Sequence, residues 1–206
     1  LVNANVFAVV VFTEDYPTTY GDGTALGANQ ATGGYSTKWG TGNSTGSGNP
    51  LCTSAAALAY GPLQPISGVA SYGFQCATAG SRDQSAGFAS QGGDGNSVYV
   101  SFLVRVTAAT PTARNLIGLR NSTGGGTLVI AAGINASRQL TLLKSGTAAA
   151  TTTAALNQNE TYFVVMRYRF VAGNGLDECA LWLNPATGQT QGGIEVAGGG
   201  KHHQPH

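Results

Sequence analysis

Charged side chains are scarce in this sequence of 206 residues. They make up 9% of the chain, whereas a soluble globular domain usually carries roughly 25%. The 10 Lys and Arg residues nearly balance the 9 Asp and Glu residues, so the formal net charge is +1. This balance excludes the strongly basic surface that binds nucleic acid or an anionic membrane. We therefore expect neither nucleic acid nor membrane insertion.

Histidine is missing from the body of the chain. The three histidines, His202, His203 and His206, lie in the tail, so a Ser-His-Asp or Cys-His arrangement would need its base at the very terminus. Glu14-Asp15 and Asp177-Glu178 are adjacent acidic pairs. Adjacent side chains of a strand point to opposite faces, so neither pair can act together on one substrate bond. We expect a non-catalytic protein without a cofactor.

Long helical and long apolar stretches are also absent from the sequence. Helical periodicity is not sustained beyond a turn or two. Residues 1–12, LVNANVFAVVVF, are apolar, but they are too short and too rich in Val for a spanning helix and lack the basic start of a signal peptide. We interpret them as a strand, and we expect a leader to have been removed before Leu1.

Cysteine occurs three times, as Cys52, Cys76 and Cys179. No CxxC spacing or nearby histidine accompanies these residues, which argues against a zinc site. We expect a Cys52–Cys76 disulfide that closes a Gly-, Ser- and Pro-containing excursion, which suits an oxidising, extracytoplasmic setting. The alternative is three buried free thiols that act as small hydrophobic side chains.

Short apolar runs separated by turn residues fill the rest of the chain. The runs are strand-length, and they cover residues 5–12, 98–107, 115–121, 127–134, 139–146, 161–170 and 179–185. Gly, Asn, Ser and Thr occupy the breaks, where Gly and Asn tolerate positive φ. In residues 98–107, Phe102, Val104 and Val106 share one face. This pattern predicts a single all-β domain, 1–206, built as an antiparallel two-sheet β-sandwich.

Two stretches resemble the laminin-G/concanavalin-A-like jelly rolls of bacterial secreted and surface proteins. The first, residues 12–39, carries Phe12, Glu14, Tyr16-Pro17, Leu26, Asn29, Gly33-Gly34 and Trp39. The second, residues 162–188, carries Asp177, Leu181-Trp182 and Asn184-Pro185. The likeness extends over about residues 12–188. It implies a jelly-roll fold and a secreted, extracellular or cell-surface location.

The sequence departs from this family after Asn184-Pro185. Such domains continue to a further strand, whereas this chain ends in residues 192–206, GGIEVAGGGKHHQPH. We therefore expect no completing strand here and a polar tail over 198–206. A missing strand leaves an open edge of unpaired N–H and C=O groups. Residues 1–11 of a neighbouring subunit are the candidate strand that fills it.

Two kinds of ligand site have candidate residues. Asp22 in GDG and Asp94 in GGDGN are candidates for calcium, which jelly rolls hold in loops, and the alternative is that both lie in ordinary Asp-Gly turns. A sugar platform would need exposed aromatic side chains, for which the loop-rich half offers Tyr20, Tyr35, Trp39 and Tyr72. Trp39 also belongs to the family-like stretch, which favours a core position for it.

Four asparagines begin an Asn-x-Ser/Thr sequence and are candidate glycosylation sites. They are Asn43, Asn121, Asn135 and Asn159. In a chain so rich in Asn and Thr, the alternative explanation is chance.

Two hypotheses about function follow from these observations. The first is a non-catalytic secreted or cell-surface structural subunit that assembles with copies of itself into a fibre or surface layer through β-strand addition. The second is a monomeric adhesion or glycan-binding module of the laminin-G-like type, whose partners are surface glycans.

Overall fold

The structure is a computed structural model, and the account below is confined to part of the chain. The structure describes residues 24–25, 40–41, 51–53, 58–61, 73–75, 84–85, 88–121, 126–152, 154–173, 176–186 and 194–196. These residues form strands, turns and irregular segments, and none of them is in a helix. The described part is therefore all-β, as the sequence predicted.

The longest strands form a four-stranded antiparallel sheet. It contains β6 (Ser97–Arg105), β11 (Thr161–Arg169), β12 (Glu178–Leu183) and β13 (Ile194–Val196), in the order β13-β12-β11-β6. β6 and β11 pair along their whole length without a break in register, from Ser97 opposite Arg169 to Arg105 opposite Thr161. The period-two pattern of β11 explains the pairing, because Tyr162, Val164, Met166 and Tyr168 are buried between less buried neighbours.

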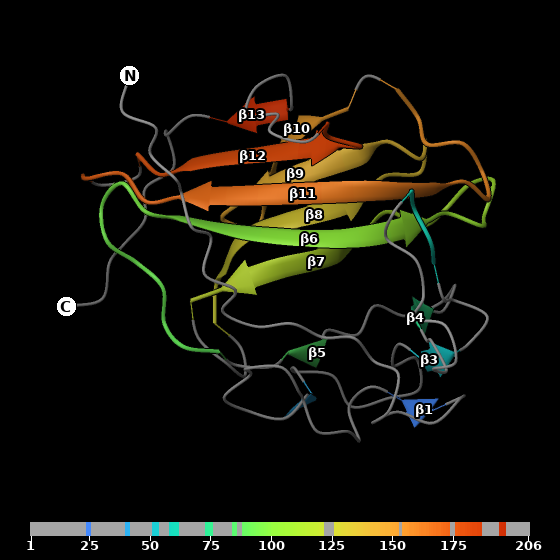
Figure 1. The fold of residues 1–206 in the computed structure, drawn as a ribbon, viewed down its shortest axis with the longest axis horizontal. Coiled ribbons are helices and arrows are strands. Elements are labelled where there is room, and N and C mark those ends of the chain that lie inside the picture. The colour runs from blue at the N-terminus through green and yellow to red at the C-terminus, as the bar shows by residue number, and fades with distance from the viewer. Residues whose placement is uncertain are drawn as a thin grey trace.

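A second four-stranded antiparallel sheet lies behind the first in Figure 1. It contains β7 (Arg114–Arg120), β8 (Leu128–Ile134), β9 (Leu140–Lys144) and β10 (Thr147–Thr151), in the order β10-β9-β8-β7. Ser145 and Gly146 join β9 to β10 with φ angles of 51° and 77°. Positive φ at both central residues is what a type I′ hairpin turn requires, and this turn matches the twist of the strands.

Five short strands belong to the first half of the chain. β1 (Thr24–Ala25), β3 (Leu51–Thr53) and β4 (Gly73–Gln75) form one small antiparallel sheet, while β2 (Gly40–Thr41) pairs with β5 (Gln84–Ser85). In Figure 1, β1, β3, β4 and β5 lie beyond β7 on the same side of the molecule.

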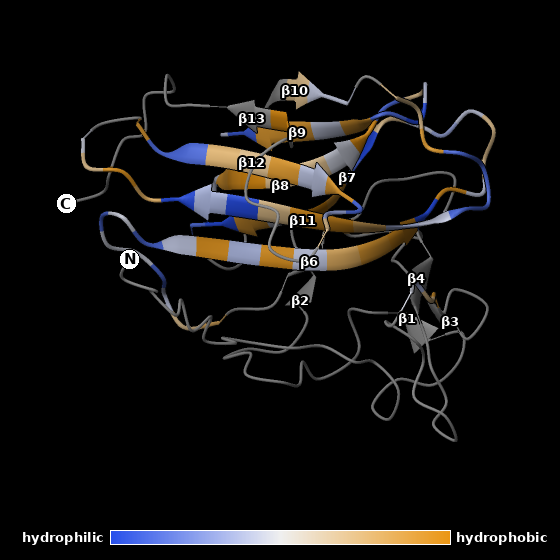
Figure 2. Cartoon of the chain, turned by 45° about the horizontal axis from the view of Figure 1, so that its top comes forward, coloured by the Kyte–Doolittle hydropathy of each residue, from blue (hydrophilic) through white to orange (hydrophobic). Residues whose placement is uncertain are grey.

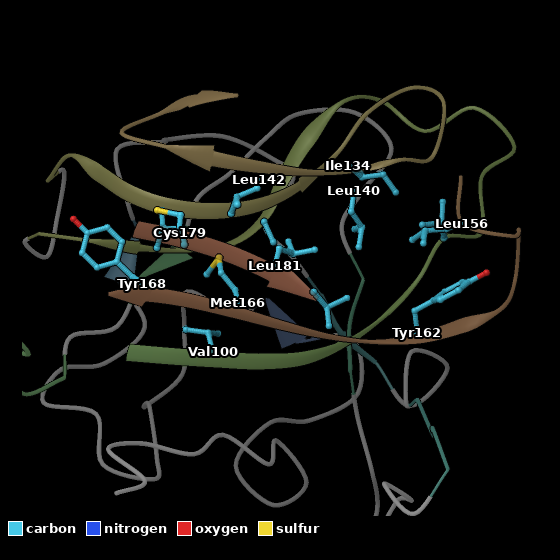
Figure 3. Packing of buried hydrophobic residues seen from close by; sticks show 14 residues of the cluster. Val100, Ile134, Leu140, Leu142, Leu156, Tyr162, Met166, Tyr168, Cys179 and Leu181 are labelled. Carbon is cyan, nitrogen blue, oxygen red and sulfur yellow. The ribbon is translucent and has the colours of Figure 1, made fainter. Parts of the chain in front are cut away.

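The two large sheets pack face to face around one apolar core. β11 contacts β8, β12 contacts β9 and β13 contacts β10. Both inner faces contribute side chains to the core (Figure 3), among them Leu140 and Leu142 from β9, and Met166 and Leu181 from β11 and β12. All four of these side chains are fully buried. Burial of this apolar surface is the main force that holds the sheets together.

The first sheet is also covered on its outer face near β12. Ala180 and Trp182 point away from the core, opposite Arg167 and Val165 of β11, yet both are buried. Tyr60 contributes to the cover, because its ring stacks on that of Phe163 with centroids 6.0 Å apart. The sheet therefore does not follow the simple rule of one apolar face and one solvated face.

The sequence predicted six of the eight strands in the two large sheets. Their apolar runs lie at 98–107, 115–121, 127–134, 139–146, 161–170 and 179–185, and the observed strands β6, β7, β8, β9, β11 and β12 lie in them or within one residue of them. The run 5–12 and the tail 198–206 lie outside the described residues. Among the described residues, no helix is long and apolar enough to span a membrane.

The expectation that no strand follows Asn184-Pro185 is wrong. β13 pairs with β12 from the same chain, with Ile194 opposite Leu181 and Val196 opposite Cys179. Only three residues of β13 pair. Glycine-rich sequence lies on both sides of them, so the apolar run is too short to indicate a strand. The gap predicted beside β12 is thus filled over this length by the chain itself.

Candidate functional site

Asp177 anchors a place in the core where several titratable side chains of the described residues meet. It lies directly before β12, and its carboxylate accepts two hydrogen bonds. Oδ2 accepts one from the Tyr168 hydroxyl at 2.5 Å and Oδ1 accepts one from the Val171 N–H at 2.9 Å. Tyr168 is on the inner face of β11. The carboxylate therefore closes the connection between β11 and β12 at one end of the core.

Lys144 reaches the same residue from the opposite sheet. It is the last residue of β9 and follows Leu140 and Leu142 on the inner face, so its stem packs in the core. Its Nζ donates a hydrogen bond to the main-chain carbonyl of Asp177. Lys144 is 7% exposed and is the one buried charged residue among those described. A polar contact between the sheets thus sits inside an apolar environment.

Cys179 completes the group, which we call the Lys144 cluster: Lys144, Tyr168, Asp177 and Cys179. Cys179 is opposite Tyr168 in the β11–β12 ladder, and Figure 3 shows the two side chains next to each other. Cys179 is a free cysteine and is buried. It therefore contributes a thiol to the cluster, and no disulfide.

Burial controls the protonation of two members of the cluster. Loss of hydration raises the pKa of the Cys179 thiol to about 11; nearby Lys144 opposes this rise and Asp177 adds to it. Burial also raises the pKa of the Tyr168 hydroxyl, and the hydrogen bond to Asp177 raises it further. Both groups therefore stay protonated near neutral pH. Neither is poised as a nucleophile there.

Glu178 belongs to a different environment on the outer face. Its Oε2 lies 3.2 Å from Arg169 Nη1 and 3.7 Å from Arg167 Nη2. The Arg167 guanidinium in turn lies over the Trp182 ring, 5.5 Å from its centroid, which is a cation–π geometry. Asp177 and Glu178 therefore serve opposite faces, as the sequence predicted from their adjacency.

The calcium candidates are not brought together by the described structure. Asp94 is exposed in a turn between Gly93 and Gly95, whose φ angles are 94° and 83°. Asp22 lies outside the described residues. Within the described ranges, no group of three or more His, Cys, Asp or Glu residues could hold a metal ion. Calcium binding stays a prediction, and Asp94 has the Asp-Gly turn geometry of the alternative.

The candidate glycosylation sites differ in exposure. Asn121 and Asn159 are exposed, and Asn159 is in a turn with φ of 64°. Asn135 is engaged instead: its Oδ1 accepts hydrogen bonds from the N–H groups of Ser137 and Gln139, and its Nδ2 donates to Gln139 Oε1. Asn43 lies outside the described residues.

The expected Cys52–Cys76 disulfide also lies outside the described residues, because Cys76 is one of the undescribed positions. Cys52 is in β3, where its backbone pairs with Phe74 of β4. The sugar-platform candidates Tyr20, Tyr35, Trp39 and Tyr72 are likewise outside the described part.

Lys144 is the residue that sequence reasoning missed. The signal was present, because Leu140, Leu142 and Lys144 occupy alternate positions of one strand and so share a face. A lysine at the third apolar position of such a strand indicates either a strand end in solvent or a buried partner. The partner, Asp177, lies 33 residues later, and only the pairing of the two sheets brings it near.

Comparisons with known proteins provide no further guide to this site. No protein-family model matches the chain, and searches of curated proteins and of solved structures also find no match.

Proposed function

We propose that the chain is a non-catalytic structural subunit of a secreted or cell-surface assembly, in which copies join through β-strand addition. The two large sheets would form part of a jelly roll of the laminin-G/concanavalin-A-like type. The observation that carries the proposal is the edge of the first sheet at β6. Support also comes from the Lys144 cluster, in which Lys144, Tyr168 and Asp177 are engaged in hydrogen bonds with each other inside the core.

β6 differs from the other edge strands of the two large sheets. It is nine residues long and contains neither proline nor a bulge in its pairing with β11. β7 and β10 have irregular registers, and β13 has three residues. Bulges and short length protect edges against pairing with other chains. Among the described residues, β6 pairs on one side only.

The direction of the β6 backbone groups follows from its ladder. Phe170 donates its N–H to the Asn96 carbonyl at 2.9 Å, just beyond the pair Ser97–Arg169. Hydrogen-bonded pairs alternate in an antiparallel ladder, so Val98, Val100, Phe102 and Val104 face β11. The N–H and C=O groups of the alternate residues, from Ser97 to Arg105, therefore point away from β11, toward the outside of the sheet.

The sequence contains a candidate strand for pairing with this edge. Residues 1–11 contain an apolar, Val-rich segment of strand length. Main-chain hydrogen bonds provide affinity in strand addition, and alternate side chains provide specificity. A strand from a neighbouring copy beside β6 would extend the inner apolar face formed by Val98, Val100 and Phe102.

The test is to measure assembly after removing the candidate added strand, residues 1–11, or one N–H group of the β6 edge. Deletion of residues 1–11 and, separately, Ser101→Pro should both abolish the oligomers that size-exclusion chromatography with light scattering detects in the unaltered protein. Ser101 is exposed, and its N–H points away from β11, so proline is tolerated there. Ser101→Thr is the matched control and should assemble normally.

Three results would contradict the proposal. An unaltered protein that is monomeric at all concentrations has no assembly to explain. A Ser101→Pro protein that assembles normally does not use β6 as the edge to which the neighbouring copy adds its strand. A Ser101→Pro protein that unfolds shows instead that the chain uses this edge for its own fold.

One observation favours the alternative, a monomeric glycan-binding module. Tyr99 is 57% exposed and is opposite Arg167 on the outer face of the first sheet. An exposed aromatic ring beside hydrogen-bond donors is suited to a sugar. Binding on a glycan array that Tyr99→Ala abolishes would support this function, and an array without binding, with and without calcium, would remove it.

A further inference from the structure

The inner face of the first sheet is incompletely covered along β6. Val100 is buried, whereas Phe102 and Val104 pack against the core but are only partly buried. β7 is the edge strand of the second sheet on the same side of the two packed sheets (Figure 1), and its Ile117 and Leu119 are partly buried as well. A strand added beside β6 would remove more of this apolar surface from water.

We propose that residues 6–12 of a neighbouring copy form the strand added to β6 and run antiparallel to it, with Val6 opposite Val104 and Phe12 opposite Val98. This inference rests on the proposed function and specifies the register of its contact. The described pairings within the two large sheets are all antiparallel, and antiparallel pairs are the commoner kind in sheets.

The alternation of the N-terminal sequence decides which face of the added strand turns inward. The even-numbered residues from Val2 to Phe12 are all apolar, whereas the odd-numbered set includes Asn3, Asn5 and Thr13. In β6 the even-numbered residues likewise face the core. Directly opposite residues share a face of the sheet, so even-numbered residues pair with even-numbered ones. A slip by one residue would turn the two asparagines toward the core.

The sizes of the inward side chains select the register among those that keep the same face. The proposed register places Ala8 opposite Phe102, so that the smallest inward side chain of residues 6–12 meets the largest of β6. Alternation of large and small side chains across facing positions lets them interdigitate. A shift by two residues would put Val6 or Val10 against Phe102 instead. Ala8 is therefore the residue that sets the register.

The outward side chains of the added strand fit the outer face of β6. Tyr99 is 57% exposed, and the proposed register puts Val11 opposite it. Aromatic and β-branched side chains stabilise a sheet as a cross-strand pair. Val9 lies opposite Ser101, whose N–H and C=O groups point away from β11. The two residues therefore form a hydrogen-bonded pair in the proposed ladder.

A disulfide between copies tests the register. A Val9→Cys protein is assembled together with a Ser101→Cys protein and oxidised, and mass spectrometry of its peptides should find positions 9 and 101 joined. Hydrogen-bonded pairs have Cα atoms about 5.5 Å apart, which a disulfide spans. Because the two cysteines are on different copies, this bond reports a contact between copies.

Phe7→Cys and Val11→Cys are the matched controls, each combined with Ser101→Cys in place of Val9→Cys. They are diagonal to Ser101 in the proposed register, at roughly 7–8 Å, and should link roughly tenfold less. A stronger link from either control would overturn the register and leave strand addition intact. Absence of all three links would contradict strand addition at β6 itself, and the register with it.

A second pair of variants tests the role of Ala8 without cysteines. Ala8→Phe crowds Phe102 and should raise the concentration needed for half-assembly roughly tenfold or more, measured by light scattering. Ala4→Phe makes the same change on the same face, but Ala4 lies beyond Arg105, where β6 ends, so this variant should assemble normally. Equal effects of the two variants, or normal assembly of Ala8→Phe, would overturn the register.

Discussion

Neighbouring residues of this chain have separate tasks, and the segment from Asp177 to Cys179 shows why. Asp177 accepts hydrogen bonds from Tyr168 and Val171 at the end of the core, whereas Glu178 pairs with arginines on the outer face. Cys179 returns to the inner face and is fully buried. The alternation of a strand sets these directions. The chemical role of each carboxylate therefore follows from its face.

The stability of the protein should fall as the pH rises from about 9 to 11, in part because of Cys179. Its pKa is raised to about 11 in the folded chain, so the unfolded chain loses the thiol proton first and is favoured as pH rises. The stabilisation is complete below the unfolded pKa. Cys179→Ala should reduce the loss over this range by about 1–3 kcal/mol, measured by urea unfolding at each pH. Equal pH slopes for both proteins would contradict the assignment.

Asn184 should be hard to replace because it has two roles. Its φ is 48°, which asparagine tolerates better than most residues. Its Oδ1 accepts the Phe163 N–H at 2.8 Å, and its own N–H donates to the Phe163 carbonyl at 2.7 Å. Asn184→Ala should lower the free energy of unfolding by about 1–3 kcal/mol. Asn184→Gly loses only the side-chain bond, so a glycine variant less stable than the alanine variant would refute the strain argument.

The strands of the second sheet depend on a close approach at Gly133 of β8. A Cβ atom there would lie 2.9 Å from the main-chain oxygen of Arg114 and 2.6 Å from Thr141 Oγ1. Backbone cannot move away cheaply, so Gly133→Ala should destabilise the protein by about 1–3 kcal/mol in thermal or urea unfolding. Gly92→Ala is the control, because a Cβ atom at Gly92 meets nothing within 4 Å. Equal stability of the two variants would contradict this reading of β8.

Element by element, the sequence predicts a strand well where apolar residues alternate over a long run. β6 and β11 follow from their patterns because both are nine residues long and carry apolar residues at alternate positions, which in β11 form one buried face. β10 was missed because Thr147–Thr151 is an alanine run without that contrast. β13 was missed because it is short. The Lys144 cluster could not be predicted, since it depends on which strands of the two sheets lie opposite each other.

At the scale of the whole molecule, the two large sheets share one core and should unfold together. Met166 lies in that core with side chains from both sheets around it. Met166→Ala should lower the free energy of unfolding by about 2–5 kcal/mol. Hydrogen exchange should show equal losses of protection in β8 and β9 and in β11 and β12. A loss confined to β11 and β12 would mean that the sheets are separate cooperative units.

The stack of Arg167 on Trp182 also gives the molecule an optical probe. The chain has two tryptophans, and Trp182 is 4% exposed with a guanidinium over its ring. In a Trp39→Phe protein, the remaining indole should emit at shorter wavelength than in the unfolded chain and should resist quenching by acrylamide. Its fluorescence then reports the state of the outer face beside β12, where hydropathy alone (Figure 2) would not lead one to look.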